Sequence, residues 1–198
     1  MPDASKGKVA ILIEEHFDPT EYRLFNDYFP KHGYEVEYVS HLWGQPELYF
    51  GSNPDNGLVE EHVTVRTEVN SVEPSDYRGI ILIGAYATDR LRYQANPKEG
   101  QPNQAPAVAF IRKAMQENAR IGTICHSLWL LCADSSLLTG RRVTCAHNII
   151  CDVEHAGGQV VFEGDATADL VVDGNLISSR FPADLPAFCK AILKALER

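Results

Sequence analysis

A cysteine and a histidine stand side by side in the stretch IGTICHSLW, between two apolar segments. The pattern predicts a strand over Ile121–Ile124, a sharp turn at Cys125 and a helix over Leu128–Ala133. Such a turn strains the residue at its apex and exposes its side chain above a sheet. Thr123 and Ser127 are small enough to flank it. The stretch therefore predicts a nucleophile elbow with Cys125 at its apex.

The position of Cys125 has chemical consequences. The positive end of the following helix favours a thiolate, so we expect the thiol pKa to fall from about 8.5 to below neutral. Backbone N–H groups at His126, Gly84 and Ala85 are predicted to form an oxyanion hole. The alternative is a buried structural cysteine that packs as a small hydrophobe. The strand–Cys–His–helix context favours the nucleophile.

The elements that must position this cysteine alternate between apolar strands and helices. This alternation predicts a flavodoxin-like α/β three-layer sandwich, with a mostly parallel sheet and helices on both faces. We expect one domain over residues 1–198, with active groups at the carboxyl ends of the strands. Besides Ile121–Ile124, the predicted strands are Lys8–Ile13, Tyr34–Val39, His62–Val69, Gly79–Ile83, Arg142–Cys145 and Gln159–Phe162. The predicted helices are Pro19–His32, Ala107–Asn118, Leu128–Ala133, Asn148–Ala156 and Ala183–Leu196.

Three segments depart from this alternation. Trp43–Gly57 contains Gly, Pro and Asn and predicts an irregular excursion. Residues 93–106 carry three prolines and predict a long loop that covers the site or an interface. Leu170–Ser178 predicts a hairpin that turns at Asp173 and Gly174.

Charge and composition exclude several classes of protein. The chain has 198 residues, with 18 Lys and Arg against 27 Asp and Glu, for a formal net charge of −9. So acidic a chain repels a phosphate backbone, and we expect no nucleic-acid partner. The apolar stretch Val9–Ile13 is too short for a membrane span, and we expect no membrane partner. Five cysteines without a secretion signal predict reduced thiols and a cytoplasmic location.

The sequence resembles the ThiJ/PfpI superfamily of the class I glutamine amidotransferase-like fold, and within it the PfpI peptidase-like branch. The elbow TICH carries the resemblance together with the pieces LLTGRRVT, AGG, VVDGNLIS and SRFPADLP that follow it. IILIG and DRLR upstream also fit. The likeness covers nearly the whole chain and is weakest at 43–57 and 93–106.

The resemblance implies Cys125 as nucleophile and His126 as its histidine neighbour. It also implies that an acid from the adjacent subunit orients this histidine, and the matching position holds Asp89, where the PfpI peptidase carries Glu. Asp89 is alternatively a surface residue at the start of a helical turn. A functional homodimer or higher homo-oligomer is therefore expected.

The resemblance further implies a carboxylic acid beside the cysteine sulfur, after the first strand. Alignment back from Gly33 assigns this acid to Asp18, with Glu14 and Glu15 as rivals. A protonated acid against a thiolate forms a charge-assisted hydrogen bond. Asp18 precedes Pro19 and is also a good N-cap for the helix that follows.

Other residues near the expected site depart from the family pattern. Ala85 replaces the second glycine of the usual oxyanion turn, and Tyr86 stands where a peptidase-like relative carries Arg. Trp129 is a candidate pocket wall, as is Glu15 if the first loop is shifted, although core packing also explains Trp129. His147 lies at a strand end and is a candidate general base or a helix cap.

We expect a cofactor-independent cysteine enzyme that acts on a small-molecule substrate. The resemblance implies reactive carbonyls such as methylglyoxal, converted to lactate by glyoxalase III-type chemistry or by related hydrolysis. One alternative is a PfpI-type intracellular cysteine peptidase. Another is a redox sensor or stress chaperone whose cysteine is oxidised without turnover. No metal-ligand spacing and no nucleotide-binding motif is present, so no cofactor is expected.

Overall fold

A seven-stranded sheet lies at the centre of the computed structural model, which describes residues 5–54, 57 and 59–198. The strand order is β12-β13-β7-β6-β1-β2-β5, and every neighbouring pair is parallel except the β12–β13 hairpin. The strands are β1 (Lys8–Leu12), β2 (Glu35–Ser40), β5 (Thr67–Glu68), β6 (Gly79–Leu82), β7 (Ile121–Ile124), β12 (Leu170–Asp173) and β13 (Leu176–Ser179). The fold is thus the flavodoxin-like α/β arrangement that the sequence predicts.

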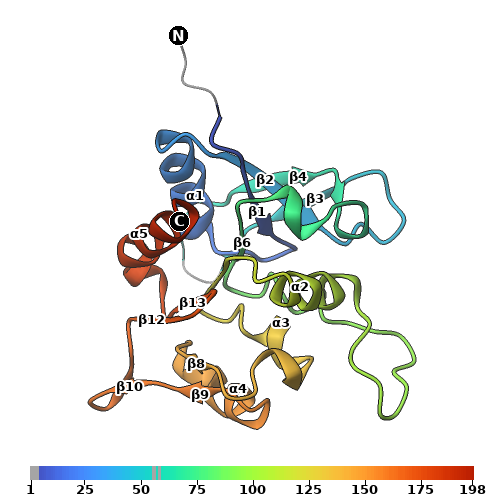
Figure 1. Cartoon of the computed structure of the whole chain (residues 1–198). Coiled ribbons are helices and arrows are strands. Elements are labelled where there is room, and N and C mark those ends of the chain that lie inside the picture. The colour runs from blue at the N-terminus through green and yellow to red at the C-terminus, as the bar shows by residue number, and fades with distance from the viewer. Residues whose placement is uncertain (1–4, 55–56, 58) are drawn as a thin grey trace.

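Helices cover both faces of this sheet (Figure 1). Helices α1 (Pro19–Lys31) and α5 (Leu185–Leu196) lie together on one face, and α2 (Pro106–Gln116) and α3 (Trp129–Cys132) lie on the other. Each apolar strand contributes side chains to the cores on both faces of the sheet, because successive side chains point to opposite faces. In β1, Val9 and Ile11 pack with α1 and α5, whereas Ala10 and Leu12 pack with α2.

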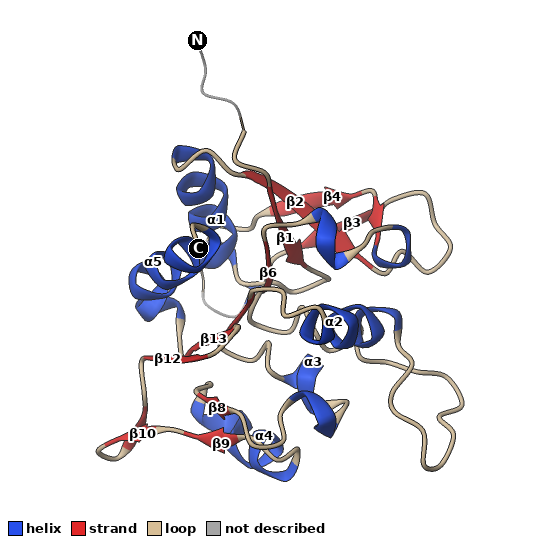
Figure 2. Cartoon of the chain, viewed as in Figure 1, coloured by secondary structure: helices blue, strands red, loops and turns tan. Residues whose placement is uncertain are grey.

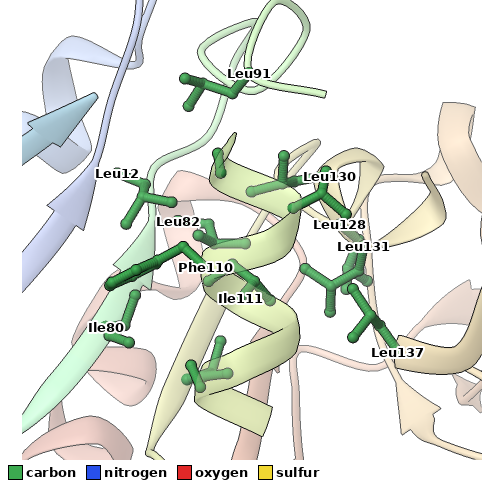
Figure 3. Packing of buried hydrophobic residues seen from close by; sticks show 14 of the residues in the cluster. Leu12, Ile80, Leu82, Leu91, Phe110, Ile111, Leu128, Leu130, Leu131 and Leu137 are labelled. Atoms are coloured by element: carbon green, nitrogen blue, oxygen red, sulfur yellow. The ribbon is translucent and has the colours of Figure 1, made fainter. Parts of the chain in front are cut away.

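The apolar layer on the α2 side supports the turn that carries the cysteine. Figure 3 shows Phe110 and Ile111 of α2 packed between Leu82 of β6 and the leucines around α3. Leu128 and Leu130 are among these leucines and are buried. Burial of such a side chain contributes roughly 1.5–3 kcal/mol to the free energy of unfolding. These leucines therefore anchor the segment after Cys125 to the core.

Most elements lie where the sequence predicts them, and their ends differ by a few residues. The third predicted helix shortens to α3, and a 3-10 turn, η6 (Pro182–Asp184), precedes α5. The fourth becomes η5 (His147–Ile149) followed by α4 (Ile150–His155). Further 3-10 turns are η2 (Val69–Ser71), η3 (Pro74–Asp76) and η4 (Ser135–Leu137). The predicted loop over 93–106 has neither helix nor strand before α2.

The prediction of an irregular segment over Trp43–Gly57 is wrong in part. Leu48–Gly51 forms β3, which pairs with β4 (His62–Val65) in a separate antiparallel ribbon. The predicted strand His62–Val69 therefore divides between this ribbon and β5 in the central sheet. Asp55 and Asn56, within the predicted segment, lie outside the described residues.

Two further ribbons stand apart from the central sheet in Figure 2. β8 (Arg142–Val143) pairs with β9 (Gln159–Val160), and β10 (Phe162–Glu163) pairs with β11 (Ala166–Thr167). The first of these, with α4, places the chain around residues 146–152 beside the elbow. Among the described residues, none of the helices has the length and apolar character that a membrane crossing requires.

Candidate active site

Cys125 sits at the junction of β7 and the turn that leads to α3. Its backbone has φ 58°, a left-handed conformation that is rare for a residue with a side chain. Two hydrogen bonds fix this turn: the Cys125 N–H donates to the Ser179 carbonyl at 3.0 Å, and the Ile124 N–H donates to Ser127 Oγ at 2.8 Å. The predicted elbow is therefore present, and its strained backbone lies at a residue with a nucleophilic side chain.

A buried carboxyl group lies directly against this cysteine, and it belongs to Glu21. Glu21 has no exposed surface, and its Oε2 accepts a 2.6 Å hydrogen bond from the Gly84 N–H. A Cβ atom placed on Gly84 would lie 2.6 Å from Glu21 Oε1 and 2.9 Å from the Cys125 Cβ. Glycine at position 84 therefore allows the acid and the cysteine to approach each other.

The assignment of this acid to Asp18 is corrected by the structure. Asp18 Oδ1 accepts hydrogen bonds from the Thr20 and Glu21 N–H groups, at 2.8 and 3.0 Å, and so caps α1. Glu21 lies one turn into the helix on the same stripe as Phe25 and Phe29. A glutamate on an apolar stripe was the signal in the sequence that pointed to a buried acid.

Neither rival acid in the first loop contacts the cysteine. Both Glu15 oxygens accept a hydrogen bond from the Gly51 N–H, at 3.3 and 3.2 Å. The carboxylate of this pocket candidate is therefore bonded to strand β3. Glu14 is buried and accepts from Arg90 at 3.1 Å. The structure thus leaves Glu21 as the acid of the thiol.

Burial and the proximity of the two groups control how Glu21 and Cys125 ionise. Desolvation, reinforced by the nearby Asp18, raises the pKa of Glu21 well above its ordinary value. Burial, and then the Glu21 charge, raise the pKa of the Cys125 thiol to about 12. The pair therefore resists holding two negative charges and keeps at least one proton at neutral pH.

The predicted fall of the Cys125 pKa is thus wrong for a physical reason. Helix α3 begins only at Trp129 and has four residues, so no long helix dipole points at the sulfur. Two backbone N–H groups, of Ala85 and His126, hydrogen-bond the sulfur and lower its pKa in part. A protonated Glu21 removes the opposing charge, which leaves these donors to favour the thiolate.

The same two N–H groups define the candidate oxyanion hole. Ala85 has φ 56°, which turns its N–H toward the cysteine. Gly84, also predicted there, donates its N–H to Glu21 instead. The Tyr86 N–H donates to the His16 carbonyl at 3.1 Å. The candidate hole therefore keeps the Ala85 and His126 donors and loses Gly84, whose N–H is already bonded to Glu21.

The His126 imidazole lies on the more open side of the elbow. Its Nε2 is 2.9 Å from Asn148 Oδ1, whereas its Nδ1 is buried and has no hydrogen-bond partner among the described residues. The ring stacks on Trp129, with centroids 5.1 Å apart, and contacts the Tyr86 ring at 5.7 Å. Asn148 is a site residue that the sequence analysis missed.

Asp89 lies close enough to His126 of its own chain for the two charges to interact. Its Oδ1 is buried without a hydrogen-bond partner among the described residues. Burial raises the pKa of Asp89, opposed by Arg92 and His126. The structure brings Asp89 near His126 within one chain. Its expected action across a subunit interface stays a prediction.

Trp129 forms one wall of a cavity of about 510 Å³ whose lining includes neither Cys125 nor His126. The Trp129 Nε1–H donates to Asp152 at 2.8 Å, and the Arg92 guanidinium lies over its ring at 5.2 Å. Cys132, Ala133, Ser135, His155 and Ala156 complete the lining. Trp129 therefore lines a cavity next to the elbow and also packs against the core, and its role as a wall of the substrate pocket stays a prediction.

His147 follows a residue that contacts the elbow, but its own ring contacts Phe181. The neighbouring Ala146 N–H donates to the Cys125 carbonyl at 3.3 Å. His147 itself is exposed and meets the edge of the Phe181 ring at 6.1 Å. Within the part of the chain that the structure describes, no three His, Cys, Asp or Glu side chains gather as a metal site would require.

Comparisons with known proteins agree with this fold. The model of the DJ-1/PfpI family matches residues 7–195. The chain is 29% identical to protein/nucleic acid deglycase 2 of Escherichia coli over 190 residues, 96% of this chain and 97% of the relative. An uncharacterized protein of Staphylococcus haemolyticus is 28% identical over 193 residues, 96% of this chain and 98% of its own length.

Solved structures give the same result. A protein of Anabaena variabilis with DJ-1/ThiJ/PfpI-like and ferritin-like domains superposes with TM-score 0.79 at 27% identity over 96% of this chain, which spans 48% of that protein. Drosophila melanogaster DJ-1beta superposes with TM-score 0.74 at 15% identity, over 97% of this chain and 91% of that one. The chain belongs to the DJ-1/PfpI family.

Proposed function

We propose that this protein is a cofactor-independent cysteine enzyme that acts on small reactive carbonyl compounds such as methylglyoxal. One observation carries the proposal: a strained, partly buried cysteine stands between a buried acid and two N–H donors, with the imidazole of the next residue on its other side. A deglycase among its relatives supports carbonyl chemistry as the class of reaction.

The first step is addition of Cys125 to the aldehyde carbon. The thiol proton passes to His126, the C–S bond forms, and the carbonyl π electrons move to oxygen. The Ala85 and His126 N–H groups stabilise the resulting oxyanion, which then takes the proton from the imidazolium, so that His126 is again neutral. Glu21 keeps its own proton through this step, because burial disfavours its carboxylate beside the sulfur.

The second stage moves a proton between the two substrate carbons. His126 removes the hydrogen of the hemithioacetal carbon as a proton, the hydroxyl proton of that carbon moves to the neighbouring oxygen, and His126 returns its proton to the neighbouring carbon. The first carbon is oxidised to a thioester as the second is reduced from ketone to alcohol, so no external oxidant or reductant is needed. Water cleaves the thioester to lactate and the free thiol. In sum, methylglyoxal and water give lactate.

Lactate formation tests this proposal. We expect purified protein to convert methylglyoxal to lactate in the absence of glutathione and of added metal, measured with D- and L-lactate dehydrogenases. Absence of lactate above the spontaneous rate would remove methylglyoxal as substrate. Casein incubated in parallel tests the peptidase alternative, and we expect it to remain intact because Trp129 and Tyr86 crowd the imidazole.

A further inference from the structure

The His126 imidazole has two nitrogens in different environments. Nε2 lies 2.9 Å from the amide oxygen of Asn148, at the exposed edge of the ring. Nδ1 is buried and has no partner among the described residues. A neutral imidazole carries a proton on only one nitrogen, so the groups around it decide which one.

The contact with Asn148 requires a particular tautomer. An amide oxygen accepts hydrogen bonds and cannot donate one. With the amide oxygen of Asn148 facing the ring, this contact is a hydrogen bond only when neutral His126 carries its proton on Nε2, which leaves a free lone pair on Nδ1. Asn148 belongs to η5, 22 residues further along the chain, so this contact is tertiary.

Charged groups around the ring favour different protonation states. The Asp89 charge interacts with His126 and favours added positive charge on the ring. On the other side, the Arg92 guanidinium lies over Trp129, whose Nε1–H donates to Asp152. The Cys125–Glu21 pair lies on the thiol side. Only Asn148 makes a directional hydrogen bond to the imidazole among the described residues.

We propose that Asn148 is a positioning residue that holds neutral His126 as its Nε2–H tautomer and so makes Nδ1 the nitrogen that accepts a proton. When Nδ1 takes up the thiol proton, both nitrogens carry N–H. Asn148 Oδ1 still accepts from Nε2–H, and the Asp89 charge stabilises the imidazolium. The kinetic part of this inference rests on the proposed function, and the tautomer does not.

Nitrogen-15 NMR measures the tautomer directly. In protein labelled at histidine, two-bond proton–nitrogen correlations distinguish Nε2–H from Nδ1–H, and His126→Gln assigns the signal. We expect Nε2–H in the wild type. We expect Asn148→Asp, which keeps an acceptor, to retain it, and Asn148→Leu, which has a similar shape and no acceptor, to shift the population toward Nδ1–H.

A control and a second variant keep the test decisive. Asn70→Leu changes an exposed asparagine of η2 and is expected to leave the His126 signal unchanged. Asn148→Ser, which is too short to reach the ring, replaces the leucine variant if that variant does not fold. An Nδ1–H tautomer in the wild type, or the same tautomer in the leucine or serine variant, would overturn the proposal.

Turnover adds a second readout with a distinguishable failure. With methylglyoxal as the probe, we expect Asn148→Leu to lower kcat about tenfold with little change in KM, because a wrong tautomer removes the base and not the binding. Asn148→Asp should recover most of the loss. Absence of lactate from the wild type contradicts the proposed function while the NMR result still decides the tautomer. An unchanged kcat in an active Asn148→Leu variant contradicts the kinetic role.

Discussion

The two sides of the elbow differ in how they are closed. On the thiol side, Glu21 is fully buried, and the missing side chain of Gly84 leaves the space in which its carboxyl group approaches Cys125. On the imidazole side, His126 rests on Trp129 and meets exposed Asn148. On the thiol side, desolvation determines which group holds a proton. On the imidazole side, a directional hydrogen bond and nearby charges determine it. The site at this turn thus combines a buried acid, Glu21, with a more accessible base, His126.

The largest expected effect comes from filling the gap on the thiol side. Gly84→Ala places a methyl group 2.6 Å from a Glu21 oxygen and 2.9 Å from the Cys125 Cβ. Overpacking of this kind costs about 3 kcal/mol. We expect the free energy of unfolding, measured in urea, to fall by about that amount.

Gly44→Ala is the matched control for this substitution. Gly44 has φ 82° and nothing within 4 Å of an added Cβ, so it measures backbone strain alone. Its cost should be about 1 kcal/mol. Equal costs at the two positions would contradict the tight approach of Glu21 and Cys125.

On the imidazole side, Asp89→Asn should lower turnover about a hundredfold, because it removes the charge that stabilises protonated His126. The location of this acid can be tested by mixing. An acid that acts within its own chain cannot complement a second chain, so we expect an Asp89→Asn protein mixed and refolded with a Cys125→Ser protein to stay inactive. Recovery of about a quarter of wild-type activity would place Asp89 across a subunit interface instead.

The pH dependence of stability sharpens the contrast between the two sides. The pKa of Glu21 is raised in the folded state, so its unfolded form loses a proton first as pH rises. Wild-type stability should therefore fall between the ordinary carboxyl pKa and the raised one, by up to about 1.4 kcal/mol per pH unit.

The stability of Glu21→Gln should lack this fall. Its free energy of unfolding, measured by urea titration, should therefore rise relative to that of the wild type between about pH 4.5 and about pH 7.5. Exposed Glu163→Gln serves as the control and should run parallel to the wild type. Parallel curves for Glu21→Gln as well would contradict a buried, proton-holding carboxyl group.

The smallest effect is expected at the N-cap of α1. Asp18→Ala removes the acceptor of the Thr20 and Glu21 N–H groups and should cost about 1 kcal/mol of unfolding free energy. Asp18→Ser restores a good cap and should recover both stability and most of the turnover. A large loss of turnover in a stable Asp18→Ser protein would return the role of the acid to Asp18.

Much of the scaffold could be predicted because the strands are continuous apolar runs and the helices carry clear stops. The elbow itself followed from the order strand, Cys125, helix. The β3–β4 ribbon could not, because its glycine- and proline-containing surroundings resemble a loop and its pairing is tertiary. Boundary errors around α3 and η5 arise where short helices compete with turns.

The missing site residues have different explanations. Glu21 was visible in the sequence on the stripe of Phe25 and Phe29, yet the choice between it and Asp18 requires knowing which helix face meets the cysteine. Asn148 gave no signal, because nothing in the sequence brings position 148 to position 126. The direction of the Cys125 pKa depends on burial, which is a property of packing.

Cysteine dependence of methylglyoxal turnover tests the central claim most directly. Wild type, Cys125→Ser and Cys189→Ser are compared for lactate formation without glutathione, Cys189 being a buried cysteine of α5. The account predicts that Cys125→Ser loses at least about a thousandfold in kcat, whereas Cys189→Ser stays active. Lactate formation at the wild-type rate by folded Cys125→Ser protein would contradict it.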